Sequence, residues 1–340
     1  GAGSRIPRKE GPAFALRLAA NIVSPLPYSA TSHDRPGYRN RLRELTREGA
    51  YDLLHCEWTP YARLREGLAL PWVVAAHNIE SQVWRRLAQA ESSLPRRLYA
   101  REQARKMERL ERRIFASAPF ATAVSEEDAR RLGAFGCRRV AVVENGVDLD
   151  AYAPAPEAQA EPRRLVFTGS LDWRANQDGV RWFAEHVHSH LRREGGYHLD
   201  VVGRRPPAGF GASLPPEIAV LADVPDVKPH LARAAVVVVP LRVGGGSRLK
   251  ILEAFALGRP VVSTTLGAEG LAVEDGRHIL LADDPEAFAR AVLSLWSAPD
   301  RARSLAGEAR SLVDARYGWD RIAQVQAALW REAASGELCR

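Results

Sequence analysis

The segment that decides the fold spans residues 241–271 and reads LRVGGGSRLKILEAFALGRPVVSTTLGAEGL. It follows a short Val-rich run, Ala234–Val239, which is typical of a buried strand. Three glycines come next, and a helical pattern over Arg248–Leu257 begins after Ser247, a residue type that caps helices well. Gly258 ends the helix, and a proline separates it from another apolar pair. The segment therefore predicts a strand, a glycine loop, a helix and a second strand.

The glycine loop predicts an anion-binding site, because N–H groups at a helix start are free and the helix dipole favours a negative ligand. The residues that offer these groups are Gly245, Gly246 and Ser247. Arg248 and Lys250 fall in the first helical turn, where a cation is unfavourable by roughly 0.3–1 kcal/mol. Their position is explained if a phosphate occupies the loop. The alternative is that Lys250 pairs with Glu253 and that Arg248 is merely solvated.

This segment resembles the donor-binding segment of the family-4 retaining glycosyltransferases, which have the GT-B fold. In that family such a strand, loop and helix hold the diphosphate of a nucleotide sugar, and two glutamates eight positions apart flank it. The resemblance implies that Glu253 is the second glutamate, which binds the ribose. Gly245 stands at the position of the first, which binds the donor sugar, so that contact is missing or comes from elsewhere.

The resemblance extends over most of the chain through short motifs in a fixed order. They are AVSEED at 123–128, ENGVD at 144–148, VFTGSLDWRAN at 166–176, VVGRRP at 201–206, VPDV at 224–227 and YGW at 317–319. Each motif is weak alone, but the order and spacing make the match specific. The family's first domain normally opens with a strand and a glycine-rich loop, and no such pattern precedes Tyr51. We expect the sequence to lack its first several dozen residues.

Strands alternate with helices along the chain, which predicts parallel sheets covered on both faces. The expected strands are Tyr51–Cys56, Trp72–Ala76, Ala121–Val124, Val140–Val143, Leu165–Thr168, His198–Val202 and Ile279–Ala282. The expected helices are Ala13–Val23, Tyr38–Glu48, Ser81–Ala118 with a break near Pro95, Glu126–Leu132, Asp178–Leu191, Pro229–Arg233, Pro285–Ser297 and the stretch Arg301–Glu337. Residues 206–216 are expected to form a loop.

The resulting fold class is α/β, with two Rossmann-like domains whose parallel sheets face each other across a cleft, as in GT-B enzymes. Residues 1–153 would form the N-terminal, acceptor-side domain. Residues 154–316 would bind the nucleotide-sugar donor. Residues 317–340 would form a helix that crosses back to the first domain, as the resemblance implies.

His77 is the main candidate of the first domain, because it follows a strand, at the sheet edge where ligands bind. A lone histidine is often only a hydrogen-bonded structural residue. The family pattern has a histidine at this point near the donor sugar, which implies that His77 faces the sugar. His55 and Glu57, beyond the earlier strand, are weaker candidates.

The family takes its diphosphate cations from the loop after the second domain's first strand, but Ser170 and Ala175 stand at those positions here. Arg174 is a displaced candidate, so Arg248 and Lys250 are expected to neutralise the leaving diphosphate. The expected catalytic residues are His77, Arg248 and Lys250. The expected nucleotide-sugar-binding residues are Gly169, Ser170, Arg174, Gly203, Arg204, Val224, Gly245, Gly246, Ser247 and Glu253. Cations and N–H groups can stabilise the developing charge without a metal, so no metal or other cofactor is expected.

The net charge of +7 lies entirely in the first part of the chain, since residues 1–155 hold 25 Lys and Arg against 18 Asp and Glu. This excess, with the basic helix at 96–113, suggests an anionic membrane surface or a lipid-linked acceptor as partner. A generally Arg-rich composition and a solvated helix are the alternatives. No nucleic-acid-binding module is recognisable. Three cysteines without metal spacing indicate reduced thiols and a cytoplasmic protein, with association at the inner membrane face left open.

We therefore expect a hexosyltransferase-like, retaining glycosyltransferase of exopolysaccharide biosynthesis. It would move a sugar from a nucleotide-diphosphate sugar to a glycan, lipid-linked or cell-envelope acceptor. One alternative is a non-catalytic nucleotide-binding GT-B relative, which Gly245 and the absent opening loop favour. The other is a GT-B nucleotide-sugar epimerase.

Overall fold

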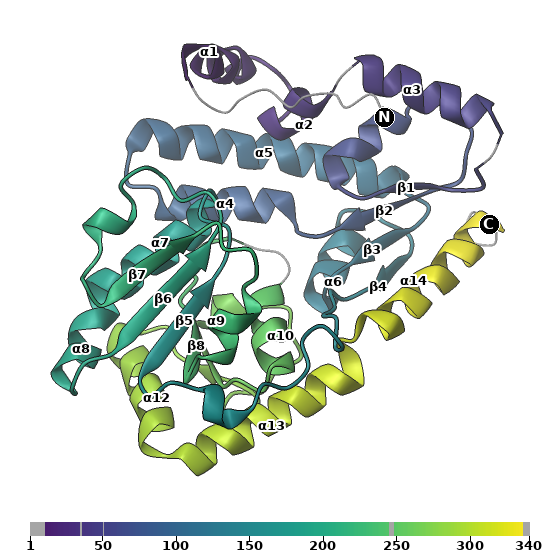
Figure 1. Ribbon diagram of the computed structural model, residues 1–340. Coiled ribbons are helices and arrows are strands. Elements are labelled where there is room, and N and C mark those ends of the chain that lie inside the picture. Colours follow the sequence, from purple (N-terminus) through teal and green to yellow (C-terminus); the bar gives the residue numbers. More distant parts are fainter. Residues whose placement is uncertain (1–10, 35, 50, 245–247, 336–340) are drawn as a thin grey trace. The chain divides into compact units, whose positions relative to one another are not determined.

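The chain forms two compact α/β units, each with its own parallel sheet (Figure 1). Unit 1 contains the described residues up to Glu144 and those from Ala323 onward. Unit 2 contains the described residues between Asn145 and Ile322. The computed structural model describes residues 11–34, 36–49, 51–244 and 248–335. It confirms the prediction of two α/β domains with parallel sheets.

The units divide after Glu144, whereas the expected boundary was residue 153. The reason is a pair of backbone hydrogen bonds that tie Val147 to unit 2. Its N–H donates to the Tyr317 carbonyl at 2.8 Å, and its carbonyl accepts from the Trp319 N–H at 3.2 Å. Residues just after the Asn145-Gly146 turn are therefore held by unit 2.

Unit 1 is built on a four-stranded parallel sheet in the order β1-β2-β3-β4. The strands are β1 Leu54–Cys56, β2 Trp72–Ala76, β3 Ala121–Ala123 and β4 Val140–Val142. All five residues of β2 are buried, as expected for an apolar strand with neighbours on both edges. The four predicted strands are confirmed, although β1 is shorter because its pairing with β2 begins at Leu54.

Helices cover this sheet, and the longest pair follows β2. The helices are α1 Gly11–Ile22, α2 Tyr28–His33, α3 Pro36–Arg47, η1 Thr59–Arg65, α4 Glu80–Ala90, α5 Leu94–Ser117 and α6 Glu126–Ala134. The predicted break near Pro95 is confirmed, because α5 starts at Leu94 and a proline is tolerated only in the first turn. The sequence analysis did not predict α2 or η1.

Unit 2 is built on a six-stranded parallel sheet in the order β10-β9-β8-β5-β6-β7. The strands are β5 Arg164–Thr168, β6 His198–Gly203, β7 Ile218–Ala222, β8 Val236–Val239, β9 Val261–Ser263 and β10 Leu280–Leu281. Strand β7, which pairs with β6 at the sheet edge, was not predicted. Its sequence, IAVLA, is apolar throughout, but at the sheet edge only Ile218 is buried and the side chains after it are partly buried or exposed.

The helices of unit 2 alternate with these strands. They are η2 Glu157–Gln159, α7 Arg174–Trp182, the π-helical segment η3 Phe183–Val187, α8 His188–Arg193, η4 Gly211–Ser213, α9 Lys228–Ala232, α10 Leu249–Ala256, α11 Thr265–Ala268, α12 Pro285–Ser297 and α13 Pro299–Arg316. The last helix, α14 Trp319–Ala334, starts in unit 2 and belongs to unit 1 from Ala323. Its Leu329 and Ala333 pack with Phe120 and Val73 of unit 1.

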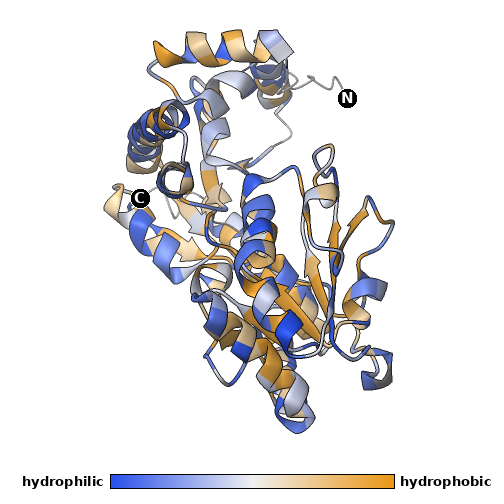
Figure 2. Cartoon of the chain, turned by 90° about the vertical axis from the view of Figure 1, so that its left-hand side faces the viewer, coloured by the Kyte–Doolittle hydropathy of each residue, from blue (hydrophilic) through white to orange (hydrophobic). Residues whose placement is uncertain are grey.

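Apolar residues are concentrated in the strands, while most helices carry both kinds of residue (Figure 2). In unit 2 the side chains of β8 are fully buried, as are Leu165 and Val166 of β5. These strands therefore form a rigid base from which the following loops project. Within the described residues, no helix is both long and apolar enough to cross a membrane.

Candidate functional site

The candidate site of unit 2 lies where the order of the strands reverses. β5 pairs with β6 on one edge and with β8 on the other, so the chain leaves β5 in one direction and returns on its other side. Open α/β sheets bind their ligands outside the carboxyl ends of the strands at such a point. Gly169 follows β5, Gly203 ends β6, and α10 carries Lys250. The structure thus brings these three predicted residues together.

The ammonium group of Lys250 occupies the middle of this site. Its Nζ donates to Oδ1 of Asn176 at 2.9 Å and lies 4.1 Å from the ring centre of Phe167. Burial, and then the charge of Arg248, lowers the pKa of Lys250 to about 7, against the opposite effect of Glu253. The hydrogen bond of Lys250 goes to Asn176 and not to Glu253. An amine that has already lost part of its hydration interacts more strongly with an anion than a solvated one.

Asn176 links Lys250 to the loop after β5, and the sequence analysis did not single it out. The side chain is buried, and its Nδ2 donates to the carbonyl of Ser170 at 2.8 Å. Its Oδ1 is thereby turned toward Lys250. Asn176 ends the motif at 166–176, but a neutral amide carried no signal in a search for charged ligands.

Two of the predicted glycines are required by close packing at the strand ends. A Cβ on Gly203 would lie 2.2 Å from the carbonyl oxygen of Gly169. A Cβ on Gly169 would lie 2.7 Å from Nδ2 of Asn176 and 3.0 Å from Nζ of Lys250. A side chain at either position would therefore displace backbone or the groups that surround the ammonium.

Gly203→Ala is expected to lower the free energy of unfolding by about 1–3 kcal/mol, the usual range for overpacking a well-packed site. Urea denaturation would measure the change. The control is Gly307→Ala in α13, where a Cβ meets nothing within 4 Å and helix propensity favours alanine. Equal stability of the Gly203 variant and the native protein would contradict the close approach of the two loops.

Arg248 differs from its predicted position. It is the N-cap residue of α10 rather than a member of the first turn, and it is only 5% exposed. Its Nε donates to the carbonyl of Glu269 at 3.2 Å, and its Nη2 lies 3.5 Å from Oε2 of the same residue. The alternative of a merely solvated Arg248 is therefore wrong. Because Arg248 is engaged by Glu269, Lys250 is the cation better placed to meet an anion.

Glu253 lies in α10 and faces Tyr152 of the segment that enters unit 2. The Tyr152 hydroxyl donates to Oε1 of Glu253 at 3.0 Å. Burial raises the pKa of the Glu253 carboxyl, while the Tyr152 hydrogen bond and the charge of Lys250 act to lower it. Oε2 of Glu253 has no hydrogen-bond partner among the residues that the structure describes. This half-buried carboxylate can accept hydrogen bonds from hydroxyl groups.

The other predicted residues of unit 2 surround the same strand ends. Ser170 Oγ donates to Oδ1 of Asp172 at 2.7 Å. Arg174 begins α7 and is exposed, and Arg204 is exposed directly after β6. Val224, after β7, packs against the core and therefore offers only apolar contact. The predicted residues Gly245, Gly246 and Ser247 lie outside the described part of the chain.

In unit 1, His77 lies at the carboxyl end of β2, beside residues that follow β1. Its Nε2 is hydrogen-bonded to Oε1 of Glu57 at 3.1 Å. The Nε2 atom of His55 lies 2.6 Å from the other oxygen of Glu57. The main candidate, His77, and the weaker candidates, His55 and Glu57, thus lie close together. Nearby, the indole N–H of Trp58 donates to the partly buried Glu80 carboxylate at 2.9 Å.

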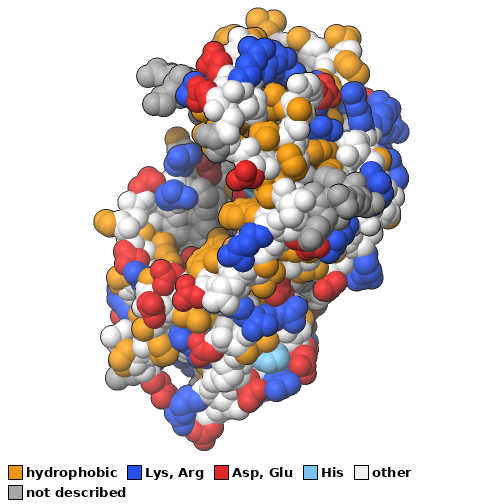
Figure 3. All heavy atoms as spheres, turned by 90° about the vertical axis from the view of Figure 1, so that its right-hand side faces the viewer, with side chains coloured by type: hydrophobic (Ala, Val, Ile, Leu, Met, Phe, Trp, Pro, Cys, Tyr) orange, Lys and Arg blue, Asp and Glu red, His pale blue; other side chains and the backbone are white. Residues whose placement is uncertain are grey.

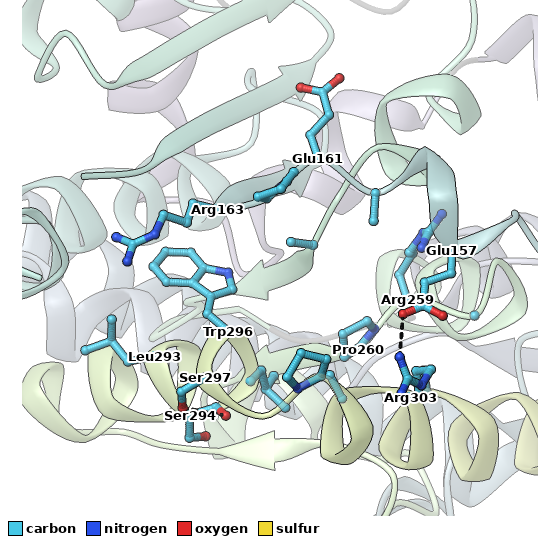
Figure 4. A pocket seen from close by; sticks show the side chains of 18 of the residues that line it. Glu157, Glu161, Arg163, Arg259, Pro260, Leu293, Ser294, Trp296, Ser297 and Arg303 are labelled. Carbon is cyan, nitrogen blue, oxygen red and sulfur yellow. Dashed lines mark hydrogen bonds and ion pairs between the residues drawn. The ribbon is translucent and has the colours of Figure 1, made fainter. Parts of the chain in front are cut away.

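A separate cavity of about 1180 Å³ lies at the opposite ends of the unit 2 strands (Figure 4). Its lining includes Arg163, Ala235 and Pro260, which precede β5, β8 and β9. Figure 4 shows Trp296 and Arg163 on one side and the ion pair between Glu157 and Arg303 on the other. Its position sets it apart from the cluster around Lys250. Among the described residues of the whole chain there is no group of three or more His, Cys, Asp or Glu side chains suited to a metal ion.

Two family models match the chain and divide it in a similar way. Residues 6–151 match the model described as Glycosyltransferase Family 4. Residues 162–298 match the model described as Glycosyl transferases group 1.

Curated relatives with the same description occur in several bacteria. D-inositol 3-phosphate glycosyltransferase of Paenarthrobacter aurescens is 29% identical over 327 residues, covering 88% of this chain and 77% of the relative. The protein of that name from Thermobispora bispora is 32% identical over 220 residues, covering 57% of this chain and 51% of the relative.

Solved structures share the fold at low sequence identity. Sucrose-phosphate synthase from Thermosynechococcus elongatus superposes with a TM-score of 0.73 at 19% identity, covering 88% of this chain and 78% of that one. Anabaena HepE, solved in complex with UDP-glucose, gives a TM-score of 0.62 at 17% identity, with 86% and 82% covered.

Proposed function

This chain belongs to family 4 of the glycosyltransferases, which have the GT-B fold, and from that premise we propose that it transfers a sugar with retained configuration from a nucleotide-diphosphate sugar. The acceptor in this proposal is a glycan, a lipid-linked glycan or a small cell-envelope precursor. The reaction breaks a glycosyl–phosphate bond, so negative charge develops on the leaving diphosphate. The protein must stabilise that charge more strongly in the transition state than in the ground state.

The observation that carries the proposal is the position and state of Lys250. It lies at the reversal point of the sheet, where nucleotides bind in this class of fold. Asn176 and the face of Phe167 hold the ammonium in place before any ligand arrives. A preorganised, partly desolvated cation stabilises developing negative charge without reorganisation. We assign Lys250 to the leaving diphosphate, together with the backbone N–H groups of the glycine loop.

The other predicted residues take supporting roles in this proposal. Arg248, held by Glu269, adds positive potential and lowers the pKa of Lys250. Glu253 accepts the ribose hydroxyls, and His77 accepts a hydroxyl of the sugar. The departing phosphate takes the proton of the acceptor hydroxyl, so no pair of catalytic carboxylates and no metal is required.

The donor nucleotide is best sought first among uridine compounds, because HepE was solved with UDP and with UDP-glucose. Calorimetric titration of the purified protein with UDP, GDP and ADP, at two salt concentrations and without added metal, tests the proposal. We expect micromolar binding of one nucleotide. Failure of all three to bind, with and without added Mg²⁺, would contradict the donor site.

Tyr152→Phe is expected to weaken UDP binding roughly 5-fold, equivalent to about 1 kcal/mol for one hydrogen bond. The hydroxyl orients the carboxylate of Glu253, and its loss leaves that carboxylate free to turn away from the ribose. Calorimetry would measure the change, with Tyr197→Phe as the matched control, since that hydroxyl bonds His188 instead. Unchanged UDP affinity of the Tyr152 variant would contradict the role of Glu253 in holding the ribose.

The acceptor search starts from the name of the curated relatives. D-inositol 3-phosphate and UDP-glucose form the first pair to assay, followed by lipid-linked glycans with the sugars of whichever nucleotide binds. Release of the nucleoside diphosphate and the configuration at the new glycosidic carbon report transfer and retention. Inverted configuration in the product would contradict the retaining mechanism.

Membrane association is a further part of the proposal, and it concerns unit 1. The exposed side of α5 carries arginines, and two exposed leucines lie at its N-terminal end. The exposed residues of α5 include Leu94, Arg96, Leu98, Arg101, Arg105, Arg109, Arg112 and Arg113. Figure 3 shows basic and hydrophobic side chains intermixed on another face of unit 1, in the upper part of the view. A basic surface with apolar contacts fits the anionic inner face of a cytoplasmic membrane.

This part of the proposal predicts that the protein sediments with vesicles containing anionic lipid and much less with neutral vesicles. Replacing Arg101, Arg105 and Arg109 by Gln should reduce the bound fraction several-fold, because each basic residue near the surface contributes about 1 kcal/mol. Equal sedimentation with both kinds of vesicle would contradict it.

A further inference from the structure

The surroundings of His77 constrain which of its nitrogens carries the proton. His77 follows β2, Glu57 follows β1, and the two side chains are joined between Nε2 and Oε1 at 3.1 Å. The second oxygen of Glu57 faces Nε2 of His55 at 2.6 Å. The indole Nε1 of Trp330, in the part of α14 that belongs to unit 1, is 2.8 Å from Nδ1 of His55. These contacts form a line from Trp330 to His77.

The direction of each contact follows from the donors and acceptors available. An indole N–H can only donate, so Nδ1 of His55 accepts from Trp330. The proton of a neutral His55 is therefore on Nε2, facing the Glu57 carboxylate. An ionised carboxylate can only accept, so Nε2 of His77 must also carry a proton. Both histidines thus present N–H groups to the two oxygens of Glu57.

The consequence for His77 is a free lone pair on its other nitrogen. With the proton on Nε2, neutral His77 has an unprotonated Nδ1 that can only accept a hydrogen bond. This atom has no hydrogen-bond partner in the part of the chain that the structure describes, and the side chain is 39% exposed. A hydroxyl group of a bound substrate is the complementary partner, whereas a phosphate oxygen is not.

We propose that Glu57 is a positioning residue, which holds His77 in the Nε2–H tautomer so that its Nδ1 accepts a hydrogen bond from a substrate hydroxyl. His55 and Trp330 complete the arrangement, because they direct a second N–H to Glu57 and keep the carboxylate in place. The link to turnover rests on the proposed function, in which His77 faces the sugar. The tautomer itself does not depend on that function.

The first test is a measurement of the tautomer, which is independent of activity. Protein labelled with ¹⁵N only at histidine would be studied by NMR, and the His77 signals would be assigned from a His77→Gln spectrum. We expect native His77 to show a protonated Nε2 and an unprotonated Nδ1. In Glu57→Gln the amide can donate as well as accept, so a mixture of His77 tautomers should appear. Trp330→Phe should change the tautomer of His55.

The second test separates turnover from binding. Glu57→Gln should lower kcat by roughly 10- to 100-fold, the range expected when one charge-assisted hydrogen bond is lost, with the affinity for the nucleotide unchanged. The matched control is Glu66→Gln, which removes a carboxylate of unit 1 that forms an ion pair with the exposed Arg113 and is not in contact with His77. The control should leave both kcat and the His77 signals as in the native protein.

The outcomes distinguish this inference from the proposed function. If His77 keeps the same tautomer in Glu57→Gln and in Glu57→Ala, the positioning role is overturned. If the tautomer changes but kcat does not, the link to turnover is overturned. If the native protein transfers no sugar in any assay, the proposed function fails, and the tautomer in the Glu57 variants still decides whether Glu57 positions His77.

Discussion

Lys250→Met is expected to lower kcat/KM for sugar transfer by about 10²–10³-fold, the range found when a preorganised group that stabilises transition-state charge is removed. Methionine keeps the length of the side chain over Phe167 but removes the charge and the hydrogen bond to Asn176. The loss should fall mainly on kcat, because the diphosphate gains most of its charge as the glycosyl bond breaks. Steady-state kinetics with the nucleotide sugar that binds would measure it.

Two controls belong with this variant. Arg290→Met removes a cation from α12 that pairs with Glu286, on the surface of the same unit, and should leave kcat/KM unchanged. Asn176→Leu keeps the lysine but removes its hydrogen-bond partner, and should lower kcat by a smaller factor. A Lys250→Met enzyme with native kcat/KM would remove Lys250 from the reaction and direct attention to Arg248.

Binding of UDP is expected to weaken as the pH rises above about 7.5, by up to tenfold per pH unit, the limit for uptake of one proton. Lys250, with its pKa lowered by burial to about 7, is mostly neutral in the free protein at pH 8. A diphosphate next to it favours the charged form and raises the pKa. The complex therefore holds more protons than the free protein, and a higher pH opposes binding.

The direction of this pH dependence of UDP binding does not change within the range. Well below pH 7 the lysine is charged in both states, so its contribution to the pH dependence disappears. The terminal phosphate of UDP has a pKa of about 6 and is fully ionised above about pH 7.5, so this phosphate adds no slope of its own. The dependence between about pH 7.5 and 8.5, below the range in which the uracil ring loses its proton, thus reports Lys250 alone among the groups that contact the diphosphate.

Calorimetry in two buffers with different ionisation enthalpies would measure both the affinity for UDP and the number of protons taken up on binding. We expect up to one proton to be taken up per UDP bound at pH 8, and none in Lys250→Met. The pH profile of the variant should be flat over the same range. Proton uptake that persists in Lys250→Met would show that another group titrates, and would overturn the assignment.

Much of the fold follows from local patterns in the sequence. The alternation of apolar strands and helices predicted the parallel sheets, and β2 and α12 have the predicted bounds, Trp72–Ala76 and Pro285–Ser297. Buried parallel strands are recognisable because they are apolar on both faces. The edge strand β7 was missed although its sequence, IAVLA, is apolar throughout; in the structure only one of its edges is paired.

The candidate site was predicted less completely than the fold. Charge and position in the chain pointed to Lys250 and His77, and the resemblance to the family pointed to Glu253. The partners of these residues come from distant segments: Asn176 is 74 residues from Lys250, Tyr152 is 101 from Glu253, and Glu57 is 20 from His77. No local pattern predicts such pairs, because they form only when separate strands end at the same edge of a sheet.

The sequence by itself determined the class of fold, the family and the types of residue that can meet a diphosphate. Only the tertiary structure decided which cation is available. Arg248 and Lys250 look alike in the sequence, but Glu269 engages the first, while the second is placed beside an aromatic ring and a neutral amide. The physical reason is that the strength and pKa of a charge depend on its burial and its neighbours, which the folded chain alone sets.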